Sequence, residues 1–168
     1  WQWLERELFI APQPGNVDWA FITPRGKEVL ESQDFETYKK GHLLPSEGLD
    51  PILVTKVKSA FIRGDYDTAI FQAFKEVEVR VRKKANLGNS DIGVPLMQTA
   101  FNPTTGTLTE KTADNGEKVA RMNLFAGAIG TYKNPSSHRE VVFADSKEAA
   151  DIIHIANQLL RIVNSISI

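Results

Sequence analysis

The chain has 168 residues, enough for one ordinary domain or one domain with a small appendage. It contains no cysteine, which excludes disulfides, thiolate nucleophiles and Cys-type zinc sites and fits a reducing compartment. Its net charge of -1 excludes a surface that is basic all over. No apolar run approaches the roughly 18 residues of a membrane span. We therefore expect a soluble cytoplasmic protein with no membrane partner.

The first 33 residues predict a small α/β piece. In chain order we expect a helix, a turn, a short strand and a second helix, over residues 1–9, 11–18, 19–22 and 24–32. Thr23 followed by Pro24 is typical of a helix start, because Thr caps the free N–H groups and Pro is tolerated at the first helical position. The chain opens on Trp1 without a methionine, so we expect a piece of a longer protein.

Residues 34–49 are polar and include Gly41 and Pro45, which favours a linker. The expected organisation is therefore a small N-terminal piece over 1–33, a linker over 34–49 and a main domain over 50–168.

The main domain predicts helices joined by short connections, with one loop over 101–116. The expected helices cover 51–63, 65–86, 89–100, 117–132 and 145–165, with caps at Asp50, Ser90 and Asp145. Asp145 and Glu148 have the spacing of a capping box. Short loops join antiparallel neighbours, so a mostly α protein with a helical bundle is the economical fold.

Two of these helices carry an apolar stripe at helical spacing. The first stripe is Ile70, Phe74, Val77 and Val81, and the second is Ile152, Ile155, Leu159, Ile162 and Ile166. The first helix also has acid-before-base pairs four residues apart, which are expected to form ion pairs on its surface. These pairs are Glu76–Arg80 and Glu78–Arg82.

Two segments carry a family resemblance: DYDTAIFQAFKEVEVRVR at 65–82 and LFAGAIGTYKNPSSH at 124–138. They resemble the Ymh-type family of conserved hypothetical proteins, which belongs to the HEPN superfamily, over about residues 50–165. The resemblance implies a helical bundle that dimerises. It also implies a metal-independent endoribonuclease of the toxin–antitoxin or phage-defence kind.

The resemblance also assigns site residues. The superfamily signature is Arg followed four to six residues later by His, often with Asn after the Arg. The matching positions are Lys133, Asn134 and His138. Lys in place of Arg keeps the positive charge but loses the planar fork that grips phosphate.

The expected chemistry needs no metal, because the 2′-OH of RNA serves as the nucleophile. His138 is the acid/base, since a histidine titrates near neutral pH. Lys133 supplies charge to the phosphate and Asn134 orients it. Glu78 is expected to support His138 from across the bundle, and Arg80 to bind phosphate. No set of ligands has metal-binding spacing, so neither a metal nor a cofactor is expected.

Plainer interpretations stand beside this one. Lys133 alone would be an ordinary cation at a helix C-terminus, and His138 an ordinary surface histidine. The bundle is then a catalytically silent HEPN module for dimerisation or ligand binding. A further alternative is a DNA-binding regulator. Residues 1–33 resemble the tail of a winged helix, with ITPRGKEVL at 22–30 as the matching segment, and would contact DNA.

Overall fold

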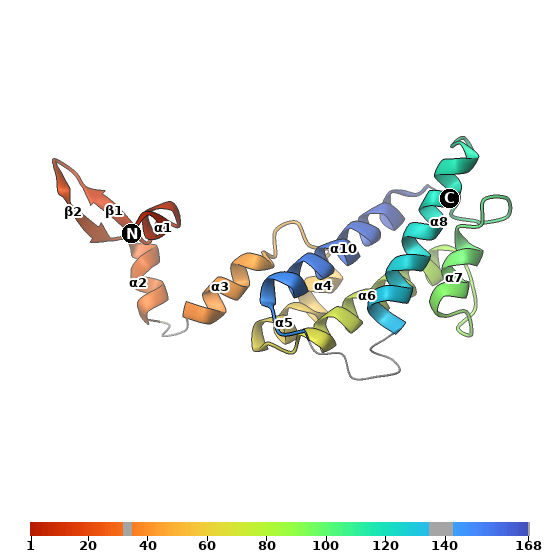
Figure 1. Cartoon of the computed structure of the whole chain (residues 1–168), viewed down its shortest axis with the longest axis horizontal. Helices are drawn as coiled ribbons and strands as arrows, with labels where there is room; N and C mark the ends of the chain where they lie inside the picture. Colours follow the sequence, from red (N-terminus) through yellow and green to blue (C-terminus); the bar gives the residue numbers. More distant parts are fainter. Residues whose placement is uncertain (32–34, 135–142, 168) are drawn as a thin grey trace. The chain divides into compact units, whose positions relative to one another are not determined.

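The computed structural model describes residues 1–31, 35–134 and 143–167, and for residues 17, 36 and 37 it describes the backbone only. The chain is mostly helical and divides into two compact units, residues 1–42 and 43–168 (Figure 1). Across the described helices, none has both the length and the apolar content that crossing a membrane demands.

The first unit is built around a two-stranded hairpin. Its elements are α1 (Gln2–Arg6), β1 (Ile10–Gln13), β2 (Asn16–Ile22), α2 (Pro24–Glu31) and α3 (Phe35–Leu43), the last of which ends one residue inside the second unit. The strands are antiparallel, with Ile10 opposite Ile22. Gly15 takes a positive φ of 81° in the turn between them, a conformation that glycine adopts without steric cost. The Thr23 hydroxyl accepts a hydrogen bond from the Gly26 N–H, so the predicted cap of α2 is confirmed.

Three expectations for this region are wrong in detail. The first helix stops at Arg6, and Leu8 has a positive φ of 59°. The expected turn over 11–18 contains most of strand β1. The expected linker over 34–49 contains α3, because Tyr38 packs its ring 4.9 Å from that of Phe9. Such a contact between distant residues stabilises a helix that local composition does not indicate.

The second unit holds the remaining helices. These are α4 (Pro51–Lys56), α5 (Lys58–Arg63), α6 (Tyr66–Lys84), α7 (Gly93–Ala100), α8 (Asn115–Ala128), the π-helix η1 (Ile129–Lys133) and α10 (Ser146–Ser165). Helix α6 is central: it packs against α10, α7 and η1 (Figure 1). The loop between α7 and α8 matches the one expected over 101–116.

The caps and stripes of this unit are largely as expected. Asp50 caps α4 through the Ile52 N–H, and Asp145 caps α10 through the Lys147 N–H. Every residue of the stripe on α6 is fully buried. The prediction of the apolar stripe on α10 is partly wrong, because Ile155 is exposed while Ile153 is buried. The buried face is therefore rotated from the one expected.

Other local features differ from the prediction. The single helix expected over 51–63 is interrupted at Val57, whose φ of -113° lies outside the helical range. Ser90 does not cap α7, which begins after Ile92. The helix expected over 117–132 changes to π geometry at Ile129.

Candidate functional site

A buried carboxylate on α6, that of Glu78, is the centre of the candidate site. Its side chain is only 5% exposed. One oxygen accepts a hydrogen bond from the Arg82 guanidinium at 2.8 Å, and the other accepts one from the Lys133 ammonium at 2.9 Å. Glu78 therefore joins α6 to the end of η1, although Lys133 lies 55 residues further along the chain.

The same carboxylate fixes the start of α7. The Gly93 N–H donates to the Glu78 oxygen that also accepts from Lys133, at 2.8 Å. Gly93 has a positive φ of 66°, which favours glycine at this position. Arg82 adds a second link, because its Nε donates to the Asp91 carbonyl at 2.7 Å. Three segments of the chain thus meet at one anion.

This cluster gathers two cations around one carboxylate. Arg82 and Lys133 are only 14% and 13% exposed, and they share the single carboxylate of Glu78. Burying a charge is costly unless it is paired, so the ion pairs with Glu78 help to hold both cations in place. Two cations thus lie beside one carboxylate at this joint between helices.

Helix geometry also changes at this point. The chain is in a π-helix from Ile129 to Lys133, and such segments are frequent at functional sites. The Tyr132 ring stacks on that of the buried Phe74 at 5.1 Å and anchors η1 to α6. Lys133, the last residue of η1, is thus held both by the packing of its neighbour and by its own ion pair.

The structure brings together most, but not all, of the residues expected at the site. Glu78 and Lys133 are in direct contact. Asn134 follows at once, with its Oδ1 beside Gly93. His138 lies within 135–142, outside the described residues.

Arg80 lies in a different cluster. Its guanidinium donates to both carboxylate oxygens of Asp50, each at 3.2 Å, and also to the side chain of Asn164 on α10. Residues two apart on a helix point about 200° away from each other, so Glu78 and Arg80 face different sides of α6.

The Asp50 cluster ties the start of α4 to α6 and α10. Burial alone would raise the pKa of Asp50, but hydrogen bonds from Arg80, the Ile52 N–H and Asn164 hold that pKa below its usual value. The Asp50 N–H donates to Asn157, whose amide donates in turn to the Gly48 carbonyl. This cluster joins three parts of the fold.

The sequence-based interpretation gave no site role to Arg82, which it placed only in an ion pair on the helix surface. The spacing of Glu78 and Arg82 was the available signal, and their ion pair is confirmed. The other expected pair is wrong: Glu76 accepts hydrogen bonds from Lys56 and Gln72 instead of Arg80. Within the described ranges, no three His, Asp or Glu side chains gather as metal ligands would.

Comparison with known proteins identifies a family. A family model described as "Protein of unknown function (Hypoth_ymh)" matches residues 47–163, most of the second unit. No curated protein and no solved structure matches significantly. The matched range includes Glu78, Arg82, Gly93 and Lys133.

Proposed function

We propose that this chain, which belongs to the Hypoth_ymh family of proteins of unknown function, is a HEPN-type, metal-independent endoribonuclease that acts as a homodimer in phage defence or as a toxin. One observation carries the proposal. Lys133, the first residue of the signature-like segment, shares the buried Glu78 with a second cation, Arg82. This arrangement supports a phosphate-binding role at the segment that continues to His138.

The proposed reaction uses the RNA's own 2′-OH. His138 accepts the 2′-OH proton, the 2′-oxygen attacks the neighbouring phosphorus, and the bond from phosphorus to the 5′-oxygen breaks. The departing 5′-oxygen takes up a proton from water, and His138 then releases its own proton to the solvent. The products are a 2′,3′-cyclic phosphate and a 5′-OH. The positive charges of Lys133 and Arg82 stabilise the negative charge that builds up on the phosphate oxygens.

Glu78 has a positioning role in this proposal. Its carboxylate holds the Lys133 ammonium in one place, so little order is lost when a phosphate binds. Asn134, next to Gly93, helps to orient the phosphate. A second copy of the chain would add its own Lys133 and Arg82 near a shared substrate.

The test is cleavage of a labelled RNA by the full chain in excess chelator. Cleavage is expected to persist in chelator and to be lost in His138→Ala. His154→Ala is the matched control, because this histidine on α10 is exposed and its ring contacts the Leu43 carbonyl, so the variant should retain activity. Cleavage that stops in chelator, or that is unchanged in His138→Ala, would overturn the proposal.

One observation favours a second candidate, a catalytically silent module for dimerisation or ligand binding. The Lys133 ammonium is already bound to Glu78 and largely buried. It also lacks the fork with which Arg grips phosphate. Lys133→Arg separates the two candidates. If the wild type does not cleave RNA and Lys133→Arg does, the chain is a silent module. If the wild type cleaves RNA, the chain is an enzyme.

The third candidate, a DNA-binding regulator, is favoured by the hairpin β1–β2 followed by α2, which is consistent with the tail of a winged helix. Charge counts against it, because residues 1–42 contain five Lys and Arg against seven Asp and Glu. A salt-dependent shift of duplex DNA, with none of RNA, would favour this candidate.

A further inference from the structure

A polar trough lies on the second unit, formed by two adjoining hollows. Both are lined by Thr107, Thr109 and Lys111. One extends along the loop from Pro103, and the other reaches across α8 to the residues that follow α10. Figure 1 shows the end of α10 beside α8. The hollows measure about 520 and 650 Å³, each large enough for a nucleotide.

The loop that forms one wall is held in a fixed shape. The Asn102 side chain accepts hydrogen bonds from the N–H groups of Thr104 and Thr105 at 2.9 and 3.1 Å. The Thr109 hydroxyl donates to the Asn102 carbonyl at 2.8 Å. A Cβ on Gly106 would lie 2.4 Å from the Asn102 nitrogen, so only glycine fits. The wall is therefore ordered before any ligand binds.

The lining of the trough is cationic, although the chain as a whole has a net charge of -1. Of its described lining residues, Lys111, Lys118 and Arg121 are cationic and Glu110 is the one acid. Arg121 and Glu110 are 3.7 Å apart, a long and exposed ion pair. Lys118 donates to the Lys111 carbonyl at 3.0 Å. The Lys111 ammonium itself has no ion-pair or hydrogen-bond partner among the residues that the structure describes.

We propose that this trough binds the sugar–phosphate backbone of single-stranded RNA, outside the Glu78 cluster. The inference rests on the proposed function, because RNA is the substrate there. The ammonium groups would neutralise phosphates, and the Thr and Ser hydroxyls would bond to phosphate oxygens and the 2′-OH. Among the described residues, no aromatic ring lines either hollow, so bases are not stacked and binding has little sequence preference.

The test is fluorescence anisotropy of a labelled RNA with the full chain, titrated at several salt concentrations. All proteins carry His138→Ala so that the RNA stays intact. Adding Lys111→Ala and Lys118→Ala should weaken binding. The negative slope of log affinity against log salt should become shallower by about 1.4, which is about 0.7 for each single-strand phosphate that is no longer neutralised. RNAs of different sequence should be affected equally.

The matched control removes the same charge elsewhere. Lys75 and Lys147 are exposed on α6 and at the start of α10, and neither lines the trough. Lys75→Ala with Lys147→Ala should leave affinity and slope close to those of the parent. An equal weakening in both pairs, or none in the trough pair, would overturn the proposal. Equal binding of single-stranded DNA, weakened to the same degree by the trough substitutions, would overturn the assignment to RNA.

The two proposals fail separately. Cleavage in chelator and its loss in His138→Ala judge the nuclease, and neither readout depends on the trough lysines. The anisotropy assay judges the trough in a protein that does not cut. Wild-type cleavage with unchanged binding in the trough variant would therefore reject the trough alone.

Discussion

The two units of the chain treat their large apolar side chains in opposite ways. In the second unit, Phe61, Phe74 and Phe125 are fully buried in one continuous core. In the first unit, Trp1 and Trp19 are 72% and 69% exposed, and Phe9 is its one large apolar side chain described as buried. A unit of about 42 residues buries too little surface to be very stable by itself. Most of the folding free energy therefore belongs to the helical unit.

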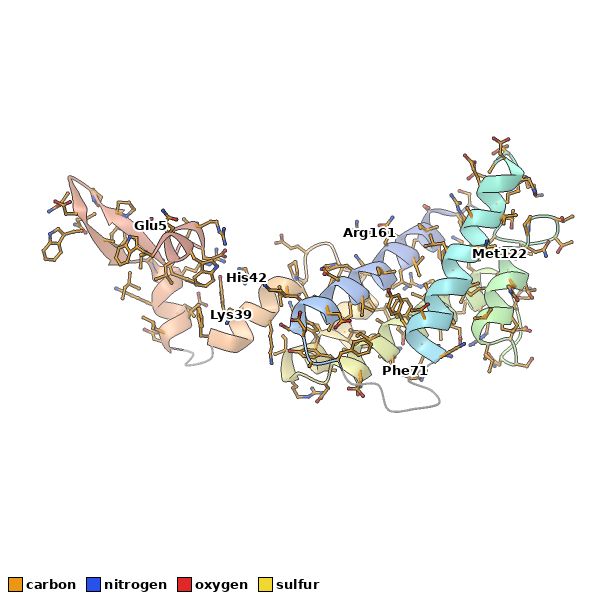
Figure 2. All side chains as sticks on the ribbon, in the orientation of Figure 1. Glu5, Lys39, His42, Phe71, Met122 and Arg161 are labelled. Atoms are coloured by element: carbon orange, nitrogen blue, oxygen red, sulfur yellow. The ribbon has the colours of Figure 1, made fainter. Side chains whose placement is uncertain are left out.

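The units also differ in their polar contacts. The helical unit uses buried carboxylates at defined joints between helices, namely Asp50, Glu76 and Glu78. The first unit instead groups exposed polar and aromatic side chains, with Arg25 over the Tyr38 ring and hydrogen-bonded to it and to His42. Figure 2 labels His42 on α3. Exposed contacts of this kind contribute little to stability, so substitutions should be felt mainly in the helical unit.

The largest difference is expected between Phe74→Ala and Trp19→Ala. Emptying the Phe74 site should lower the free energy of unfolding by about 3–5 kcal/mol, because a cavity remains in the core. Trp19→Ala should change it by less than about 0.5 kcal/mol, since Trp19 is exposed. Urea denaturation followed by circular dichroism measures both. Similar losses of stability would mean that the first unit has a core of its own.

The next largest difference lies within α6. Glu78→Gln should cost about 3 kcal/mol, because two nearly buried cations lose their counter-charge. Glu76→Gln should cost about 1 kcal/mol or less, because its partner Lys56 is half exposed and can be hydrated. Thermal unfolding of both variants decides between them. Equal costs would show that the Glu78 cluster is an ordinary surface pair.

The pH dependence of stability tests the contribution of the ionised Asp50 carboxylate to the helical unit. Its pKa is lowered on folding from an ordinary value of 3.8. The stability it contributes is therefore complete above that value and is lost as the pH falls through the lower folded pKa. Asp50→Asn should flatten this acid limb and reduce stability at neutral pH. An unchanged acid limb in that variant would contradict the role given to the ionised carboxylate.

The smallest expected effects concern two glycines. Gly93→Ala should cost about 1 kcal/mol, because Gly93 has a positive φ and donates its N–H to Glu78. Gly127→Ala should stabilise by up to about 1 kcal/mol, because it lies within α8 and a Cβ there meets open space. Denaturant midpoints of the two variants should move in opposite directions. A shift of the same sign would contradict the local geometry.

Local chemistry predicted the helix starts well. A cap followed by proline at Thr23-Pro24 and Asp50-Pro51 needs only neighbouring residues, and both caps are confirmed. The helix α3 could not be predicted in this way, because its aromatic residues are stabilised by Phe9, which lies far away in the sequence. The π geometry of η1 likewise gave no local signal that could be recognised.

The candidate site was predicted only in part, because it too depends on contacts between residues that are distant in the sequence. Resemblance to a family selected Glu78 and Lys133, which the structure brings into contact. Their direct ion pair depends on how α6 and η1 pack, which spacing along the chain does not reveal. Helical periodicity could have separated Arg80 from Glu78, since residues two apart face different ways. Periodicity also placed Arg82 one turn from Glu78, which is the contact observed.

The most direct measurement is identification of the ends that the full chain produces from RNA in the presence of chelator. The account predicts 2′,3′-cyclic phosphate and 5′-OH ends, and no cut at a site where the 2′-OH is replaced by hydrogen. Cleavage that persists at such a 2′-deoxy site, or that leaves 5′-phosphate ends, would contradict it.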